Sequence, residues 1–537
     1  MFSLISTVID TTKPPPPHFV WPHPQSIELL PQFFTINPNQ FQIIVDSACD
    51  TLTSAIARYN PSRLFIQDCS QMDSSFNGTN FHTETLNLRS DSNHLGELRN
   101  LTLLFTGECE RYPYFGMVER YYLKVDCEQG AFVFGESIWG ALRGLETFSQ
   151  LLVHVGVDQF VLHTARIHDY PRYSHRGLLI DTSRHFLPKK QILKTIDAME
   201  MNKLNVLHWH MTDDQSFPFE SETFPQLSRK GSYHASTHVY KAKDIGDIIE
   251  YARLRAVRII PEFDSPGHTF SWGLGYPQLI TACYDEQNQI KGGLLDPTSA
   301  VTYSFIRKLF LEIAEKFPDK YFHLGGDEVE DDCWAANINI TSFMNRTNMT
   351  DDYERLQGFY VGQLVKIANH LNRSSIVWQE VLNSIGDDLP KDVLVQIWIE
   401  WPSVDLRWRD AIGNATAAGY KVLLSAPWYL DHISATVDWR RFYEEDPEDF
   451  DGTEQQRKLV IGGEACMWGE FTDASNLISK TWPRASAVAE RLWSSKALND
   501  SEKAIPRFRE HGCRMRRNGL RVGPADGPGY CACDVAM

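Results

Sequence analysis

Two adjacent carboxylates that follow two glycines form the most chemically suggestive segment of the sequence. The segment Gly325–Glu328 reads Gly-Gly-Asp-Glu and comes directly after the short apolar run Tyr321–Leu324. Neighbouring residues on a strand point to opposite faces, so Asp327 and Glu328 can share one site only if the chain leaves the strand at the glycines. Most Asp-Glu pairs are solvated loop charges, but the glycines favour a site that contains a general acid or base.

Polar and aromatic residues follow nearly every apolar run in the C-terminal two thirds of the chain. If these runs are barrel strands, the residues that follow them meet at one face of the barrel. Carboxylates framed by aromatic rings suit a sugar pocket, because rings stack on the CH faces of a sugar and charged groups hold its hydroxyls. The segments are Asp181–His185, His208–Asp214, Glu262–His268, His323–Glu328, Trp378–Glu380, Trp398, Trp428–Asp431 and Gly463–Glu470.

The apolar runs alternate with helical stretches, which predicts an α/β fold with a (β/α)₈ TIM barrel over residues 169–537. A doubly wound open sheet is the alternative, and no glycine-rich phosphate loop supports it. The predicted strands are Gly177–Ile180, Asn205–His208, Arg258–Glu262, Tyr321–Leu324, Ser375–Trp378, Val393–Trp398, Lys421–Leu424 and Leu459–Ile461. The predicted helices include Pro188–Asn202, Ile245–Arg255, Tyr303–Lys316 and Tyr353–His370.

A smaller α+β domain is predicted before the barrel, over residues 21–168. Strand-like runs at Phe41–Val45, Leu101–Phe105 and Tyr121–Val125 accompany one clear helix at Trp139–Val153. Residues 1–20 include the run Pro14–Pro17 and are expected to form a leader or linker. This leader lacks the basic residues and the long apolar core of a convincing signal peptide.

Composition excludes two classes of partner. Acidic residues number 69 against 52 basic ones, for a net charge of −17. That balance repels phosphate backbones, so no nucleic-acid partner is expected. No stretch approaches 18 uninterrupted apolar residues, so no transmembrane segment is expected.

Cysteines and glycosylation sequons point to the secretory pathway, and a lysosomal or secreted protein is expected. The ten cysteines include no CxxC pair, so scattered disulfides are favoured over a zinc cluster. Eight asparagines head an N-x-S/T sequon, and the three between residues 339 and 348 predict an exposed loop. The predicted glycosylation sites are Asn77, Asn100, Asn339, Asn345, Asn348, Asn372, Asn414 and Asn499.

His208 and His210 leave a second chemistry open. Alternate strand residues share a face, and such a pair holds zinc in metal-dependent amidohydrolase barrels, where Asp213 or Asp264 would complete the site. The sequence offers few further ligands, so no metal and no other cofactor is expected. A third possibility is a catalytically inactive sugar-binding homologue, which would have no need of an acid at Glu328.

Four longer motifs occur in unbroken order around these residues. They are Arg176-Gly177 with Asp181–His185, Asn205–His210, Gly325–Val329 with Cys333-Trp334, and Trp482–Ala485 with Ala489–Trp493. Together they resemble glycoside hydrolase family 20, the β-N-acetylhexosaminidases, and most of all the animal lysosomal α/β-subunit type. The resemblance runs from about residue 139 to the C-terminus. It implies an exo-acting, retaining hydrolase that removes terminal β-linked N-acetylglucosamine or N-acetylgalactosamine from glycoconjugates, with a glycan or glycolipid as substrate.

The resemblance also implies roles for individual residues. The acetamido oxygen of the substrate attacks the anomeric carbon, Glu328 acts as general acid and then base, and Asp327 holds the acetamido N–H. Asp264 and His268 would orient this pair. Trp378, Trp398 and Trp468 would wall the acetamido pocket and Tyr429 would donate to its carbonyl. The hydroxyls of the terminal sugar would be bound by Arg184, Asp213 and Glu470.

On the acceptor side, Asp431 would disfavour negatively charged substrates, although a protonated His432 beside it would act in the opposite direction. The same resemblance implies a homodimer and the disulfides Cys49–Cys109, Cys283–Cys333 and Cys513–Cys531. Cys69 and Cys127 are paired only by elimination, and Cys466, in a buried motif, is expected to be free.

Overall fold

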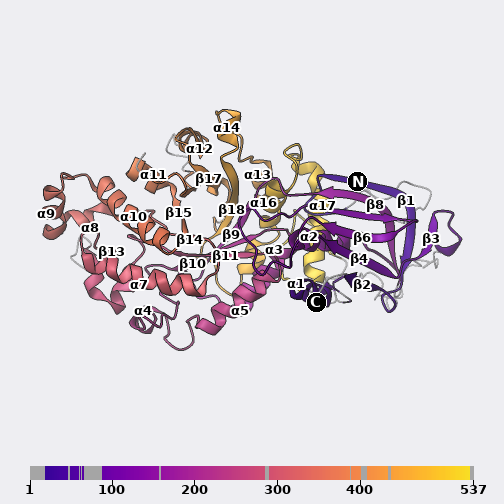
Figure 1. Ribbon diagram of the computed structural model, residues 1–537, viewed down its shortest axis with the longest axis horizontal. Helices are drawn as coiled ribbons and strands as arrows, with labels where there is room; N and C mark the ends of the chain where they lie inside the picture. Colours follow the sequence, from indigo (N-terminus) through magenta and orange to yellow (C-terminus); the bar gives the residue numbers. More distant parts are fainter. Residues whose placement is uncertain are drawn as a thin grey trace.

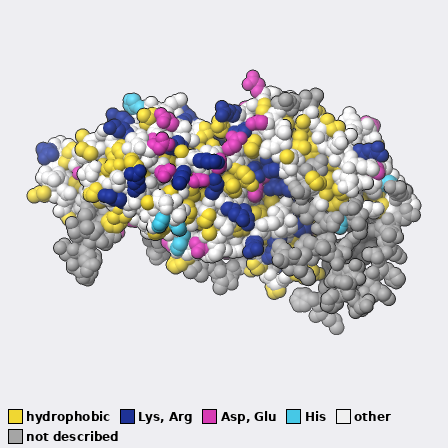
Figure 2. All heavy atoms as spheres, turned by 90° about the horizontal axis from the view of Figure 1, so that it is seen from below, with side chains coloured by type: hydrophobic (Ala, Val, Ile, Leu, Met, Phe, Trp, Pro, Cys, Tyr) yellow, Lys and Arg dark blue, Asp and Glu magenta, His cyan; other side chains and the backbone are white. Residues whose placement is uncertain are grey.

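The computed structural model describes residues 19–45, 49–59, 61, 63–65, 88–156, 159–284, 290–386, 389–400, 408–432 and 437–531. The molecule is elongated, with a β-sheet towards one end and a barrel towards the other (Figure 1). No helix in these ranges is long and apolar enough to cross a lipid bilayer. On the face shown in Figure 2, the basic side chains lie among acidic and apolar ones over the described surface.

The N-terminal part is an eight-stranded sheet with two helices. The strands pair in the order β2-β4-β6-β5-β8-β1-β3, and β7 pairs with β8. Helix α2 packs on the central strands, and α1 packs beside α2. The strands are β1 (Ser26–Ile36), β2 (Gln42–Val45), β3 (His94–Glu97), β4 (Asn100–Phe105), β5 (Tyr121–Asp126), β6 (Gly130–Gly135), β7 (Val153–Gly156) and β8 (Gln159–Asp169). The helices are α1 (Asp50–Tyr59) and α2 (Ile138–Leu151).

Helix α2 is buried on nearly all sides, because it lies between the sheet and the barrel. It begins at Ser137, whose hydroxyl accepts hydrogen bonds from the backbone N–H groups of Trp139 and Gly140. Its buried Arg143 donates to the carbonyl of Ala256, a residue that precedes a barrel strand. The helix predicted at Trp139–Val153 is therefore confirmed, and it joins the two parts of the molecule.

The C-terminal part is a closed barrel of eight parallel strands, which confirms the predicted fold class. The strand order is β9-β10-β11-β14-β15-β16-β17-β18, and β18 pairs back onto β9. All eight predicted strands are present. They are β9 (His175–Asp181), β10 (Val206–Thr212), β11 (Arg258–Phe263), β14 (Tyr321–His323), β15 (Ser374–Trp378), β16 (Leu394–Ile397), β17 (Lys421–Leu424) and β18 (Val460–Met467).

Helices surround the barrel and a hairpin extends one of its loops. The four helices predicted in this region are α3 (Lys189–Met201), α5 (Ala242–Arg253), α7 (Ala300–Lys316) and α10 (Tyr353–His370). The others are α4 (Gln226–Gly231), α6 (Phe270–Gly275), α8 (Asp331–Ala335), α9 (Ile338–Arg346), α11 (Gln379–Ile385), α12 (Trp408–Ala417), α13 (Trp439–Glu444), α14 (Glu454–Arg457), α15 (Leu477–Thr481), α16 (Arg484–Trp493) and α17 (Ser501–Arg517). The hairpin consists of β12 (Ile280–Tyr284) and β13 (Ile290–Leu295).

Two barrel strands are longer than predicted, and this changes where their polar residues lie. Strand β10 continues to Thr212 and β18 continues to Met467. His208, His210 and Glu464 are therefore fully buried inside the barrel, not on its rim. Apolar periodicity missed these extensions because the buried polar residues are paired with one another, as described below.

At the junction, each part of the molecule inserts one tryptophan into the hydrophobic core of the other. Trp21 packs in the barrel core and stacks on His511, at 6.1 Å between ring centroids. Trp493 of α16 packs in the core of the sheet domain, and its indole N–H donates to Asp169. We propose the boundary between residues 168 and 169, where β8 ends, with these exchanged rings fixing one part against the other.

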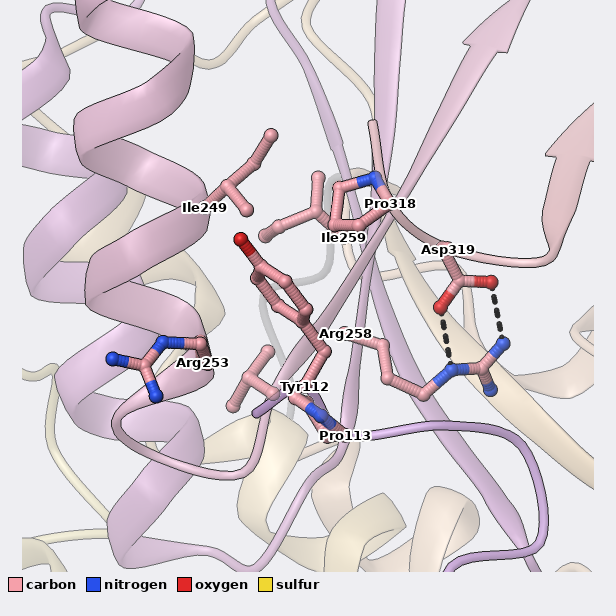
Figure 3. Close-up of a pocket in the computed structure, with 9 residues that line it drawn as sticks. Tyr112, Pro113, Ile249, Arg253, Arg258, Ile259, Pro318 and Asp319 are labelled. Atoms are coloured by element: carbon pink, nitrogen blue, oxygen red, sulfur yellow. Dashed lines mark hydrogen bonds and ion pairs between the residues drawn. The ribbon is translucent and has the colours of Figure 1, made fainter. Parts of the chain in front are cut away.

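A small pocket lies at the amino-terminal end of the barrel strands. Arg258 at the start of β11 donates two hydrogen bonds to Asp319, and Tyr112 from the sheet domain covers the space beside them (Figure 3). Because barrel active sites form at the opposite end, where the strands finish, this pocket is a feature of the junction.

Two predicted disulfides are present, Cys49–Cys109 and Cys513–Cys531. Cys333 is disulfide-bonded, and the side chain of its expected partner Cys283 lies outside the described residues. Cys127 is a free, exposed thiol, so its pairing with Cys69 by elimination is wrong; Cys466 is free and buried, as predicted.

Seven of the predicted glycosylation sites are exposed. They are Asn100, Asn339, Asn345, Asn348, Asn372, Asn414 and Asn499. Asn77 lies outside the described residues. The loop expected between residues 339 and 348 is wrong, because Asn339 and Asn345 lie on helix α9.

Candidate active site

The chain leaves β14 at the two glycines, as the sequence predicts. Gly325 and Gly326 have φ angles of +69° and +98°, and Glu328 also lies in the left-handed region at +49°. A Cβ on Gly325 would lie 1.6 Å from Oδ1 of Asp264, so only glycine fits. The backbone N–H of Gly326 donates to the same Asp264 oxygen over 2.8 Å. This turn brings Asp327 and Glu328 to the carboxyl-terminal end of the barrel.

His268 lies between the two carboxylates and connects them to Asp213. Its Nε2 is 3.7 Å from Asp327 Oδ2 and 3.6 Å from Glu328 Oε2. Its Nδ1 lies 3.2 Å from Asp213 Oδ1. Although burial opposes it, the charge of Asp213 raises the pKa of His268 well above its usual range. A protonated His268 therefore faces four carboxyl groups, since Asp264 Oδ2 also lies 4.0 Å from its Nε2.

The two carboxylates differ in exposure. Asp327 is 8% exposed, whereas the Glu328 side chain is half-exposed. Burial raises the pKa of Glu328, and the charge of Asp327 raises it further. Burial and the charge of Asp327 also raise the pKa of Asp264 well above its usual range. Glu328 is thus the accessible carboxyl that holds a proton most readily, as a general acid must.

Arg184, in the loop after β9, is held by carboxylates on its inner side. Its Nη1 lies 2.9 Å from Asp213 Oδ2 and 3.2 Å from Asp181 Oδ2, and its Nε lies 3.8 Å from Glu470 Oε1. The guanidinium lies over the ring of Trp468, 5.1 Å from its centroid. Burial disfavours ionisation of Asp213, but His268 and Arg184 lower its pKa. Arginine and carboxylates fixed in this way are suited to hydroxyl groups.

Four aromatic side chains form one cluster beside these charges. The ring of Trp378 lies 6.3 Å from Trp398 and 6.1 Å from Trp468, and Trp398 stacks on Tyr429 at 6.1 Å between ring centroids. All four come from different strand ends of the barrel. The cluster gives the site an apolar wall next to its carboxylates.

Asp431 lies close to this wall. It is partly buried, and burial raises its pKa. Its neighbour His432 is exposed, and the His432 ring lies 5.5 Å from the Tyr429 ring. All ten residues assigned to catalysis or sugar binding from the sequence, together with Asp264 and His268, thus lie at the carboxyl-terminal end of the barrel.

Sequence reasoning missed two glutamates that contact the aromatic wall, Glu262, which is fully buried, and Glu380, which is partly buried. Glu380, at the start of α11, accepts from the Trp398 indole over 2.8 Å, and Glu262 accepts from the Trp378 indole over 2.9 Å. Burial and the charge of Asp327 raise the pKa of Glu380 to about 8. Both residues were visible as polar residues at strand ends, but no spacing signal indicated which ring each one meets.

The His208 and His210 pair does not form an open metal site. Both nitrogens of His210 lie within hydrogen-bonding distance of carboxylates, Glu262 Oε2 and Asp213 Oδ2. His208 lies between Glu464 and Glu262, whose charges raise its pKa to about 9 although burial opposes this. A metal would need these imidazoles deprotonated, whereas their surroundings keep them protonated.

Comparison with known proteins decides the family. The model for the glycosyl hydrolase family 20 catalytic domain matches residues 173–496, and a model described as beta-acetyl hexosaminidase like matches residues 20–151. The chain belongs to glycoside hydrolase family 20.

Relatives in family 20 match almost the whole chain. It is 45% identical to the beta-hexosaminidase subunit beta of Mus musculus, over 95% of this chain and 92% of the relative. It is 43% identical to the beta-hexosaminidase subunit alpha of Bos taurus, over 95% of this chain and 94% of that relative. The crystal structure of a chitobiase from Flavobacterium johnsoniae superposes with a TM-score of 0.78 at 28% identity, over 94% of this chain and 73% of that one.

The catalytic domain and these relatives make the chain an exo-acting β-N-acetylhexosaminidase. Family 20 enzymes release terminal β-linked N-acetylhexosamines with retention of configuration, using the acetamido group of the substrate as the nucleophile. Neither the metal-dependent amidohydrolase nor the inactive homologue finds support among the relatives.

Proposed function

We propose that Glu328 is the general acid and base of this hydrolase and that Asp327 binds the acetamido N–H of the substrate. The observation that carries this is the Gly325-Gly326 turn, which brings both carboxylates to one imidazole and leaves Glu328 exposed with a raised pKa. Asp327, buried beside it, would stabilise the positive charge that develops on the acetamido group.

The reaction then proceeds in two displacements. The acetamido oxygen attacks C1, the bond from C1 to the leaving oxygen breaks, and Glu328 gives its proton to that oxygen. Water next attacks C1 of the cyclic oxazoline-type intermediate and gives a proton to Glu328. The bond from C1 to the acetamido oxygen breaks, so the ring opens and the acetamido group is restored. Two inversions at C1 give net retention.

The remaining residues bind the terminal sugar. Trp378, Trp398 and Trp468 would pack around the acetamido methyl, and the Tyr429 hydroxyl would donate to its carbonyl oxygen. The sugar hydroxyls would be held by Arg184, Asp213 and Glu470. Support comes from the tight ion pairs of Arg184 and from its position over Trp468, which would close the pocket at the non-reducing end.

The acceptor side carries a partly buried carboxyl. Asp431 follows directly after the aromatic wall, and its negative charge would repel a sulfate or a sialic acid on the substrate. We therefore propose a preference for uncharged β-linked N-acetylglucosamine and N-acetylgalactosamine termini.

The test is an assay on an aryl β-N-acetylglucosaminide and on the matching plain β-glucoside, each with and without EDTA. Cleavage of the N-acetyl substrate alone, unchanged by EDTA, is the expected result. Equal cleavage of both sugars would require a nucleophile from the protein and would contradict the role of Asp327. Loss of activity in EDTA would instead support the alternative of a catalytic metal bound by His208 and His210.

We also propose that the chain enters the secretory pathway and forms a homodimer. Two disulfides and seven exposed sequons support the first proposal. The dimer rests on the family resemblance. Endoglycosidase treatment should reduce the mass of the secreted protein, and light scattering should give about twice the 61.5 kDa of one chain plus its glycans.

A further inference from the structure

Glu262 lies at the centre of the barrel and is fully buried. Two hydrogen-bond donors, the Trp378 indole and His210 Nδ1, and two further imidazole nitrogens surround its two oxygens. Oε1 lies 2.9 Å from the Trp378 indole nitrogen and 3.0 Å from His323 Nδ1, and Oε2 lies 2.6 Å from His210 Nδ1 and 3.0 Å from His208 Nε2. We propose that Glu262 is a positioning residue that fixes the acetamido wall and the sugar-binding carboxylate at the same time.

One arm of this arrangement reaches the acetamido pocket. Trp378 is the central ring of the aromatic wall, in contact with both Trp398 and Trp468. Its indole N–H donates to Glu262. A tryptophan ring can be turned about two side-chain torsions, and a single strong acceptor selects one orientation of the ring plane. The shape of the pocket around the acetamido methyl therefore depends on Glu262.

The other arm reaches the hydroxyl-binding end. His210 bridges Glu262 to Asp213, with its Nε2 2.8 Å from Asp213 Oδ2. That same Asp213 oxygen meets Arg184, and the second oxygen meets His268. The chain of hydrogen bonds from Glu262 thus ends on the groups that would hold the sugar and face Glu328.

The position requires a charged acceptor. A carboxylate accepts hydrogen bonds and donates none, which suits the Trp378 N–H at one oxygen and the His210 N–H at the other. Although burial opposes it, the surrounding histidines, His323 first, lower the pKa of Glu262 well below its usual range. A glutamine there would present an NH₂ group to one of these donors, so one arm would lose its partner.

Glu464 provides a matched control inside the same barrel. It is equally buried and accepts from His175 Nε2 over 2.6 Å, from His208 Nδ1 over 2.8 Å and from Gln396 Nε2 over 3.0 Å. It has no hydrogen bond to Trp378 or to His210 among the described residues. Losing its charge should therefore disturb folding as much as losing the charge of Glu262, without releasing the acetamido wall.

The experiment compares Glu262→Gln with Glu464→Gln, and it rests on the proposed function. The readout is kcat/KM on aryl glycosides of N-acetylglucosamine and of its N-propionyl analogue, with thermal unfolding measured in parallel. A well-shaped pocket discriminates one methylene by about 10-fold or more. For Glu262→Gln we expect about 10–100-fold lower kcat/KM on the N-acetyl substrate, as for a small misplacement of binding groups, and a several-fold smaller preference over N-propionyl.

For Glu464→Gln we expect a fall in Tm similar to that of Glu262→Gln. Its preference for the N-acetyl over the N-propionyl substrate should stay within about twofold of the wild-type value. The proposal would be overturned if this substrate preference changed equally in both variants, or if it did not change in Glu262→Gln. If Glu262→Gln does not fold, the substitution Trp378→β-(3-benzothienyl)alanine tests the same hydrogen bond. It keeps the bicyclic ring and removes the N–H that donates to Glu262. It should reduce the preference by the same factor, and an unchanged preference would overturn the proposal. Failure of the proposed function would appear separately, as wild-type cleavage of the plain glucoside.

Discussion

The two ends of the barrel use the same residue types for opposite purposes. At the amino-terminal end each of the buried cations below contacts a carboxylate, and two arginines share one. The pairs there are Arg258 with Asp319, Arg143 and Arg176 with Glu119, and Lys203 with Asp169. At the carboxyl-terminal end carboxylates outnumber cations. Arg184 and His268 face Asp181, Asp213, Asp264, Asp327, Glu328 and Glu470, and Glu380 lies beside Asp327 and Glu328.

The difference teaches where a fold can hold reactive groups. Where buried cations face carboxylates in this way, the ion pairs hold the structure together, and those of Arg176 and Lys203 connect the two parts of the molecule. Where carboxylates are in excess and buried, some must hold a proton, and their pKa values rise. The predictions below test this contrast, beginning with the largest expected effect.

Glu328→Gln removes the accessible proton donor. We expect kcat/KM on an aryl β-N-acetylglucosaminide to fall by about 10²–10⁴-fold, the usual contribution of a general acid. Stability should stay the same or rise, because a carboxyl with a raised pKa is lost from a group of like charges. Activity assays and thermal unfolding measure the two effects, and a fall in Tm with little loss of rate would contradict the assignment.

Asp319→Ala tests the opposite end. It leaves the Arg258 guanidinium buried without its carboxylate, since the two side chains are only 1% and 4% exposed. Breaking such a pair costs about 3–5 kcal/mol of unfolding free energy. The rate per folded molecule should be unchanged at low temperature. A loss of rate with full stability would mean that the two ends are coupled in catalysis.

Asp327→Asn tests the buried member of the catalytic pair. We expect a fall in kcat of about 10²–10³-fold, comparable to the loss of one group that stabilises transition-state charge. Steady-state kinetics on an aryl β-N-acetylglucosaminide should show the loss in kcat, because the charge that Asp327 stabilises develops in the transition state. Loss of binding with an unchanged kcat would instead make Asp327 a simple ground-state contact.

Glu380→Gln should alter the pH dependence of stability. The pKa of Glu380 is raised from 4.5 to about 8, so the folded state keeps a proton that the unfolded chain loses. The contribution of Glu380 is full below about pH 4.5 and is lost as the pH rises through 8. Thermal unfolding from pH 4 to 9 should therefore show a smaller decline in the variant than in the wild type. Parallel curves would show that Glu380 is ionised throughout.

Charged substrates should reveal the smallest effect. An aryl N-acetylglucosaminide with a 6-sulfate should be cleaved about tenfold more slowly than the neutral one, or 1.4 kcal/mol in activation free energy. Asp431→Asn should reduce the difference. Equal wild-type rates on the two substrates would contradict the proposed preference for uncharged termini.

Much of the fold follows from local pattern. The eight barrel strands, the helices between them and the turn at Gly325 carry their own signals, either as apolar runs or as residues that tolerate left-handed backbone. The long strands β1 and β8 were missed because their burial depends on partners far away in the sequence.

The supporting groups of the site could not be read in the same way. Glu262 meets Trp378 across 116 positions, and Glu380 meets Trp398 only because α11 follows β15 at a particular angle. Such contacts arise from strand register and barrel closure, so single-sequence periodicity contains no record of them. The pairing of Cys127 failed because it was reached by elimination alone, and Cys127 is a free, exposed thiol.

The hydrogen atom that serves as the side chain of Gly325 has a consequence for mutational tolerance. Replacing it with a methyl group would place a carbon where the Asp264 carboxylate now lies, and would push the Asp327–Glu328 segment away from His268. Alanine at this position would therefore abolish turnover although every charged and aromatic group of the site were retained. An inventory of functional groups would classify that variant as harmless, and only the backbone geometry identifies it as damaging.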